Sequence, residues 1–211
     1  MTTHHLDPDW IVPDWPAPPG IRAVCTTRAG GVSTGPYASL NLGEHVGDVP
    51  ASVAANRERL AQAIGARPVF LRQVHGTDVT LLDAATVDDT QADAACTAHP
   101  GLACTVMVAD CMPVLLTDAQ GRRVAAAHAG WRGLAAGVLA RAVQSFDDDQ
   151  RRHGELMAWL GPCIGPQAFE VGDEVKAQFE AIDGEAGQCF KPAGAPGKWP
   201  AGPPRLARRR L

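Results

Sequence analysis

The stretch VAAAHAGWRGLAAGVLARAVQSF, residues 124–146, decides the fold class. Residues 124–128 form a short apolar run typical of a buried strand, and Gly130 then permits a close turn. From Trp131 to Phe146 the apolar side chains recur at i, i+3, i+4 and i+7, which predicts one amphipathic helix. A buried strand that leads directly into a helix indicates a domain of mixed secondary structure.

Similar patterns continue along the chain. Strands are predicted at residues 21–27, 69–73, 79–82, 102–108, 113–117 and 156–160, and helices at 50–64 and 171–182. Residues 28–48 form a long loop before the first helix. Several strands are apolar on both faces, so the sheet should be covered on both sides. The irregular interleaving of strands and helices favours the α+β class, with layered mixed β-sheets flanked by helices in a single domain over residues 1–211.

The last part of the chain lacks such patterns. After Gly184 the sequence is rich in Gly and Pro, and its apolar residues lose their periodicity. We therefore expect this segment to pack poorly and to leave a sheet edge or apolar surface uncovered. The basic run at residues 205–210 is interpreted as a solvated tail, because it has no interleaved aromatic side chains.

Composition excludes several classes of protein. The net charge of −4 gives no general attraction to nucleic acid or to an anionic membrane. No apolar run reaches the length of about 18 residues that a membrane-spanning helix needs, and the N-terminus lacks the pattern of a signal peptide. The six cysteines form no Cys-x-x-Cys pair. We expect a cytoplasmic protein with free thiols, either a monomer or a homodimer.

Three separate residues are candidates for one metal site. His75, Cys111 and His128 each stand where an apolar run gives way to Gly, Pro or Asp. Two imidazoles and a thiolate leave a fourth position open, as in a catalytic zinc site. Two other interpretations remain open: Cys111 as a nucleophile with His128 as its base, or a buried structural cysteine beside a turn histidine.

Anion binding has a weaker signal. Arg28 stands next to Gly30-Gly31, whose backbone N–H groups could form a nest, although an ordinary hairpin explains the same residues. Arg132 lies in the first turn of the helix predicted from Trp131, where the positive end of the helix dipole favours an anion. Cys163 lies in a rigid loop after a strand and either lines the same cleft or simply packs there.

Seven motifs occur in order and together carry a family resemblance. They are TTRAGGVS at 26–33, SLNLG at 39–43, QVHG at 73–76, ADA at 92–94, ADCMPVL at 109–115, HAGWRG at 128–133 and GPCIGP at 161–166. With them the chain resembles the laccase-domain or multicopper polyphenol oxidase family, whose members are also described as purine nucleoside phosphorylases and peptidoglycan editing factors. The resemblance covers residues 20–191, and residues 192–211 form a divergent tail.

The resemblance implies a zinc site at His75, Cys111 and His128, which would also be the catalytic residues. It implies substrate or phosphate contacts from Arg28, Asn41, Arg132 and Cys163. The implied fold is related to cysteine-hydrolase-like toxin domains, and the family's last strands are expected to be missing here. The implied reactions are phosphorolysis of adenosine, inosine and methylthioadenosine, with adenosine deamination alongside.

Other functions of the family remain alternatives. A multicopper centre needs clustered His-x-His pairs, and the seven histidines contain none, although a His₂Cys site could hold one copper ion. The remaining alternatives are a Cys–His hydrolase that edits cell-wall precursors and a truncated, inactive member that only binds metal. Zinc-dependent nucleoside chemistry fits best, because zinc activates water and a nearby arginine can hold phosphate.

Overall fold

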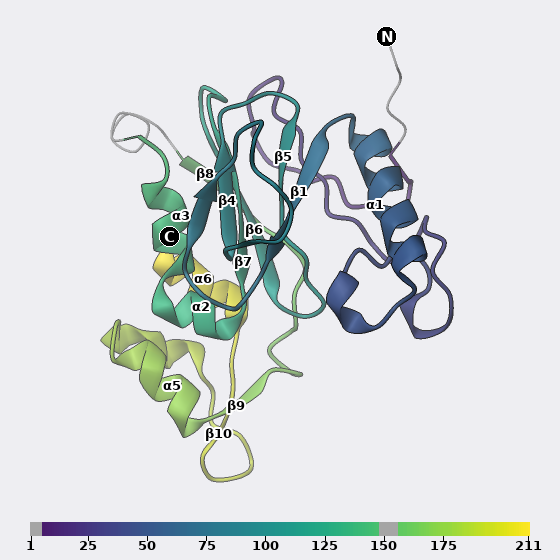
Figure 1. Ribbon diagram of the computed structural model, residues 1–211. Coiled ribbons are helices and arrows are strands. Elements are labelled where there is room, and N and C mark those ends of the chain that lie inside the picture. Colours follow the sequence, from purple (N-terminus) through teal and green to yellow (C-terminus); the bar gives the residue numbers. More distant parts are fainter. Residues whose placement is uncertain (1–5, 148–155) are drawn as a thin grey trace.

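The computed structural model describes residues 6–147 and 156–211 (Figure 1). Its centre is a five-stranded sheet in the order β2-β4-β7-β6-β8. The strands are β2 (Val79–Leu81), β4 (Ala94–Thr97), β7 (Val124–Ala129), β6 (Met112–Asp118) and β8 (Leu156–Leu160). Only β2 and β4 run parallel, and the other neighbouring pairs are antiparallel. The predicted α+β class, with several sheets flanked by helices, is confirmed, and the central sheet is the mixed one among the described residues.

A smaller parallel sheet lies beside one face of the central sheet. It consists of β3 (Thr90–Gln91), β1 (Arg67–Arg72) and β5 (Leu102–Thr105), in the order β3-β1-β5. Val69 and Leu71 of β1 pack with Ala95 of β4, which joins the two sheets. Helix α1 (Pro50–Ile64) covers the outer side of the small sheet, where Leu60 packs with Phe70.

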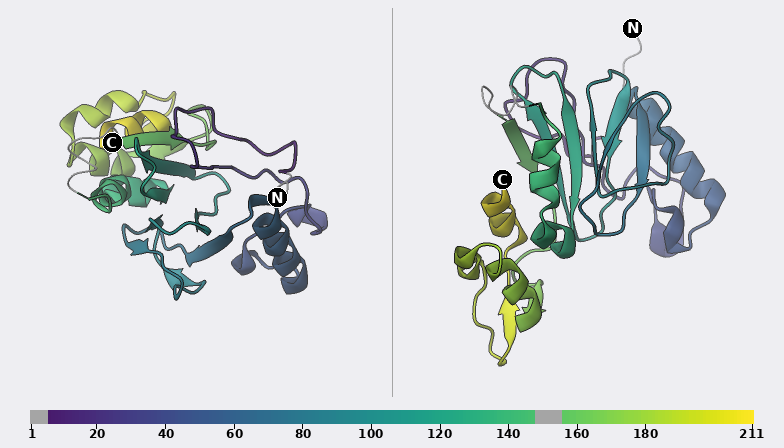
Figure 2. Two further views of the ribbon diagram at one scale, coloured as in Figure 1. Left: turned by 90° about the horizontal axis from the view of Figure 1, so that it is seen from above. Right: turned by 60° about the vertical axis from the view of Figure 1, so that its left-hand side comes forward.

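Helices cover the opposite face of the central sheet (Figure 2). They are α2 (Trp131–Ala136), α3 (Val138–Gln144) and α6 (Pro203–Arg210), and the main core cluster joins them to β4, β6 and β7. The single helix predicted from Trp131 to Phe146 is therefore two helices. They separate at Gly137, whose φ of 103° is left-handed and ends α2.

The N-terminal segment corrects another prediction. Residues 21–27 form no strand, and one antiparallel bridge between Ile11 and Cys25 is the pairing found there. β-Branched residues favour a strand only when a neighbouring strand is available to pack against. The loop that follows contains two short 3-10 helices, η1 (Gly35–Tyr37) and η2 (Glu44–Val46).

The C-terminal segment is well packed, so the prediction for it is wrong. After β9 (Glu170–Gly172) and α5 (Asp173–Glu180) come η3 (Gly184–Cys189), β10 (Lys198–Pro200) and α6. Strand β10 pairs with β9. The helix predicted at 171–182 is thus shorter and follows a strand.

The basic run of α6 is likewise not a solvated tail. Leu206 and Ala207 are 1% and 0% exposed, and Arg209 bonds Asp183 and Glu185. Spacing over only two turns is too short to reveal this buried face in the sequence. Among the described residues, no helix is long and apolar enough to cross a membrane.

Candidate metal centre

Three strand ends bring the predicted ligands together. His75 follows β1, Cys111 directly precedes β6, and His128 lies near the end of β7. Their ligand atoms all lie within 4.8 Å of one another. The Cys111 Sγ is 3.7 Å from the His75 Nε2, and the two imidazole rings meet edge to face with centroids 4.7 Å apart. The prediction that these three side chains converge is confirmed.

The group suits a metal ion in both chemistry and spacing. With Zn–N bonds of about 2.0–2.1 Å and a Zn–S bond of about 2.3 Å, neighbouring ligands in a tetrahedral site lie roughly 3.4–3.6 Å apart. The sulfur–nitrogen distance of 3.7 Å is close to this value, and the three ligand atoms all lie within 4.8 Å of one another, so they would draw closer around an ion. The same donors also suit copper. Three ligands leave a position for a further molecule.

Gly130 leaves room for the side chains of His75 and Cys111 because it has no Cβ atom. A Cβ atom at Gly130 would lie 2.6 Å from the His75 Cδ2 and 3.0 Å from the Cys111 Sγ. Real Cβ contacts are longer than this, so any side chain here would displace the ligands. The close approach of the β7–α2 turn therefore depends on glycine at this position.

Asp93, which directly precedes β4, contacts both histidine segments. Its carboxylate accepts hydrogen bonds from the backbone N–H groups of Val74, His75 and Gly76 at 3.0, 2.9 and 2.7 Å. It also bonds the Nδ1 of His128 at 2.8 Å. Burial opposes ionisation of Asp93, but the bonds from His128, Gly76 and Val74 outweigh it and lower the pKa of this carboxyl.

The pKa values of His128, which is buried, and Cys111, which is half-buried, are shifted in opposite directions. Burial lowers the pKa of the His128 imidazole, and the nearby His75 adds to this effect although the Asp93 carboxylate opposes it. Burial raises the pKa of the Cys111 thiol to about 11, and the neighbouring Asp110 adds to the rise. Without a cation beside it, this thiol stays protonated at neutral pH, which does not favour a simple thiolate nucleophile.

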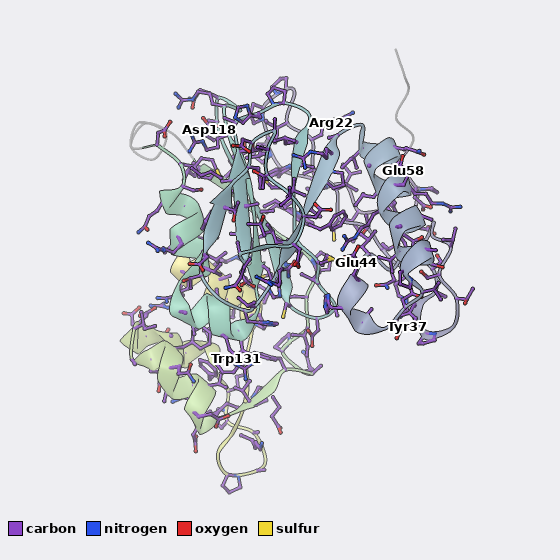
Figure 3. The ribbon with its side chains drawn as sticks, in the orientation of Figure 1. Arg22, Tyr37, Glu44, Glu58, Asp118 and Trp131 are labelled. Carbon is purple, nitrogen blue, oxygen red and sulfur yellow. The ribbon has the colours of Figure 1, made fainter. Side chains whose placement is uncertain are left out.

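The cluster opens into a cavity of about 1310 Å³, which is lined by the N-terminal segment, the end of α1, β5 and β6. The cavity extends from His75, Cys111 and His128 to Arg122 and Arg123. These arginines follow Asp118, which Figure 3 shows at the end of the molecule opposite Trp131. Among the described residues that line the cavity, Asp110 is the one carboxylate. The other lining residues are apolar, polar without charge, or basic.

The predicted substrate contacts divide into two groups. Arg28 and Asn41 line the cavity. Arg28 donates to the carbonyl groups of Ala38 and Pro36 at 2.8 and 2.7 Å, and Asn41 donates to Asp48 at 3.0 Å. These bonds fix both side chains in the loop.

Arg132 and Cys163 are not among the residues that line the cavity. The exposed Arg132 guanidinium lies over the Trp131 ring, 4.4 Å from its centroid, and Cys163 packs against the main core. Helix α2 has only six residues, so few aligned peptide groups contribute to the dipole at the expected anion site. Substrate binding by all four residues stays a prediction.

Sequence reasoning missed two positioning groups, Asp93 and Gln73. The Gln73 side chain both donates to and accepts from the Met107 backbone, at 2.8 and 2.7 Å, which ties the His75 loop to the segment before Cys111. Asp93 had a usable signal, because a carboxylate between two alanines at a buried strand needs a partner. Gln73 had none beyond its place beside His75.

Relatives of this chain have names that point to nucleoside chemistry. It is 54% identical to a purine nucleoside phosphorylase of Pseudomonas aeruginosa over 96% of this chain and 81% of that protein. It is 50% identical to the purine nucleoside phosphorylase YfiH of Escherichia coli over 95% of this chain and 82% of that one.

Solved structures agree with the fold. A crystal structure of a Neisseria meningitidis protein of the DUF152 family matches with a TM-score of 0.87 and 43% identity, over 95% of this chain and 81% of that one. YlmD of Geobacillus stearothermophilus matches with a TM-score of 0.78 and 30% identity, over 90% of this chain and 75% of that one.

The family model described as multi-copper polyphenol oxidoreductase laccase matches residues 22–211. That range includes β10 and α6, so the match continues through residues 192–211. The relationship to cysteine-hydrolase-like toxin domains stays a prediction. The chain belongs to the multi-copper polyphenol oxidoreductase laccase family, which includes relatives named purine nucleoside phosphorylase.

Proposed function

We propose that this protein is a zinc-dependent purine nucleoside phosphorylase that acts on adenosine, inosine and methylthioadenosine and also deaminates adenosine. The observation that carries the proposal is the convergence of His75, Cys111 and His128 at one end of a large cavity. The names of relatives about half identical to this chain support it.

The three ligands would hold zinc with their Nε2, Sγ and Nε2 atoms. Because an ionised carboxylate only accepts hydrogen bonds, the bond to Asp93 requires the proton of His128 to sit on Nδ1. The Nε2 of His128 then keeps its lone pair for the metal. When bound, zinc supplies Lewis-acid chemistry that lowers the pKa of coordinated water and polarises a substrate oxygen.

Arg28 is proposed to bind phosphate, because it is the predicted arginine contact that lines the cavity. Its described bonds to Pro36 and Ala38 use two N–H donors and hold the guanidinium still. A guanidinium has five such donors, so others remain for an anion in the cavity. In phosphorolysis a phosphate oxygen bonds the ribose C1′ as the bond to the purine N9 breaks, so an oriented phosphate is the main requirement. Asn41, Arg132 and Cys163 are proposed as further substrate contacts.

A copper-dependent polyphenol oxidase is the second candidate. The description of the matching family model favours it, and the His₂Cys donor set suits copper as well as zinc. The alternatives of a peptidoglycan-editing Cys–His hydrolase and an inactive metal-binding member lack such an observation.

Metal analysis and product identification test these candidates. The purified protein should hold about one equivalent of zinc, and chelation should abolish the phosphate-dependent release of purine from inosine. The other product should be ribose 1-phosphate. Cys111→Ser should lose both metal and activity, while Cys189→Ser, which changes a buried thiol that does not line the cavity, should retain both.

Each competing function has its own outcome. Phenol oxidation that requires copper, with no purine release from zinc-loaded protein, would replace the proposal by the oxidase. Cleavage of a cell-wall amide by metal-free protein would support the hydrolase. Zinc binding without turnover of any of these substrates would leave a metal-binding member only.

A further inference from the structure

We propose that Asp93 is a positioning residue that assembles the metal site before the ion binds, by fixing the backbone of the His75 loop and the imidazole of His128 with one carboxylate. This inference rests on the metal site of the proposed function. It assigns a role to a residue that binds neither metal nor substrate.

The first half of the argument is the backbone around His75. His75 has a φ of 60°, a left-handed conformation that is rare for a residue with a side chain. The N–H groups of Val74, His75 and Gly76 all point at the Asp93 carboxylate. Three successive N–H groups that converge on an anion form a nest, so the negative charge of Asp93 stabilises this unusual turn. This backbone conformation directs the His75 ring toward Cys111.

The second half is the orientation of His128. The same Asp93 oxygen that accepts from the His75 N–H, Oδ1, lies 2.8 Å from the Nδ1 of His128. A carboxylate in this position fixes the tautomer and the ring plane of a metal-binding histidine. One oxygen atom therefore couples the two imidazole ligands.

Asp93 is itself held firmly. Its side chain is 0% exposed, its N–H donates to the Asp78 carbonyl at 3.1 Å, and its own carbonyl accepts from the His128 N–H at 2.7 Å. The pairing of β4 with β7 thus fixes the position of the carboxylate relative to His128. Because the sheet fixes Asp93 and His128, the conformation of the His75 loop and the orientation of the His128 ring should exist in the metal-free protein.

A purely structural role for Asp93 predicts a different pattern. A carboxylate that only holds the loop would affect the stability of the metal-free fold and leave the affinity of the folded fraction for zinc unchanged. The test therefore needs zinc affinity and histidine tautomer as readouts, separate from catalysis.

The principal variant is Asp93→Asn, with Asp78→Asn as its matched control. Both remove one carboxylate next to the same loop, but the Asp78 side chain is exposed. Zinc affinity, measured by competition with a chromophoric chelator on folded protein, should fall about 10- to 100-fold for Asp93→Asn and should not change for Asp78→Asn. Asp93→Glu, which keeps the charge and moves it by one methylene group, should also weaken zinc.

A measurement on the unchanged protein covers the case in which the variants do not fold. ¹⁵N NMR of the metal-free wild type, at a pH where imidazole is neutral, should show His128 protonated on Nδ1. Protonation on Nε2 would overturn the inference, and so would zinc affinity in Asp93→Asn equal to that of the wild type. Failure of the wild type itself to bind zinc would instead overturn the proposed function.

Discussion

At the scale of single residues, the site depends on Gly130 because this residue has no side chain. Gly130 has a φ of −63°, which any residue can adopt, so its backbone conformation does not require glycine. The requirement comes from space, because His75 and Cys111 occupy the volume that a Cβ would need.

We therefore predict that Gly130→Ala weakens zinc binding and also destabilises the metal-free fold by about 1–3 kcal/mol, the usual cost of overpacking. Isothermal titration with zinc and urea unfolding measure the two effects. Gly184→Ala is the control, since a Cβ there would meet nothing within 4 Å. Equal zinc affinity in Gly130→Ala and the wild type would contradict this account of the site.

The candidate metal ligands were easier to predict from the sequence than the residues that position them. His75, Cys111 and His128 have side chains whose chemistry is specific, so their type and position at strand ends made them candidates, and the motifs around them strengthened the prediction. Asp93 and Gln73 act through hydrogen bonds to backbone groups of segments far along the chain. Such bonds leave no local pattern, because their partners are known only once the sheets are assembled.

At the scale of elements, the connection between β6 and β7 is closed by Asp118. This carboxylate ends β6, is 0% exposed, and accepts from the backbone N–H groups of Arg122 and Arg123 at 2.8 and 3.1 Å. The Arg122 Nε adds a bond at 2.9 Å. Burial opposes ionisation, but these bonds outweigh it and lower the pKa of Asp118.

A lowered pKa in the folded state makes this contribution to stability depend on pH. The stabilisation is present above the unfolded value of about 3.9 and is lost as the pH falls through the lower folded value. We predict that Asp118→Asn lowers the free energy of unfolding by about 1–3 kcal/mol at neutral pH, and by less at pH values below the folded pKa. Urea unfolding across this range checks it, with the exposed Asp14→Asn as control. If Asp118→Asn lowers the free energy of unfolding as much in acid as at neutral pH, the predicted pH dependence is wrong.

Element prediction succeeded where a pattern was long and failed where it was short or interrupted. The helix from Pro50 and the strands β6, β7 and β8 agree with the sequence to within a residue or two. Strand β4 was missed because its four residues, Ala94–Thr97, include two alanines of low strand propensity. The break at Gly137 was missed because the apolar spacing continues across it.

At the scale of the whole molecule, the C-terminal helix joins parts of the chain that are far apart. The guanidinium of Arg210 donates to the carbonyl groups of Leu134 and Ala135, at the end of α2. Arg209 bonds Asp183 at the other side, and Leu206 is buried in the main core. Helix α6 thus contributes to the layer that supports β7 and its His128.

We predict that Leu206→Ala lowers the free energy of unfolding by about 2–5 kcal/mol, as for other buried leucines. Arg208→Ala, which removes an exposed side chain of the same helix, should change it by less than about 0.5 kcal/mol. Thermal and urea unfolding of the metal-free protein measure both. A Leu206→Ala protein as stable as the wild type would restore the view of a loosely attached tail.

The convergence of ligands from three distant segments has a consequence for unfolding. His75 and Cys111 are 36 residues apart in the chain, so a bound ion would tie together segments that are no longer held side by side in the denatured ensemble. Ions that bind only the native state shift the folding equilibrium by mass action, by about 2.7 kcal/mol at a hundredfold excess over the dissociation constant. The melting temperature of this protein should therefore rise with the free metal concentration of its surroundings. Its lifetime in a cell should then lengthen as more metal becomes available.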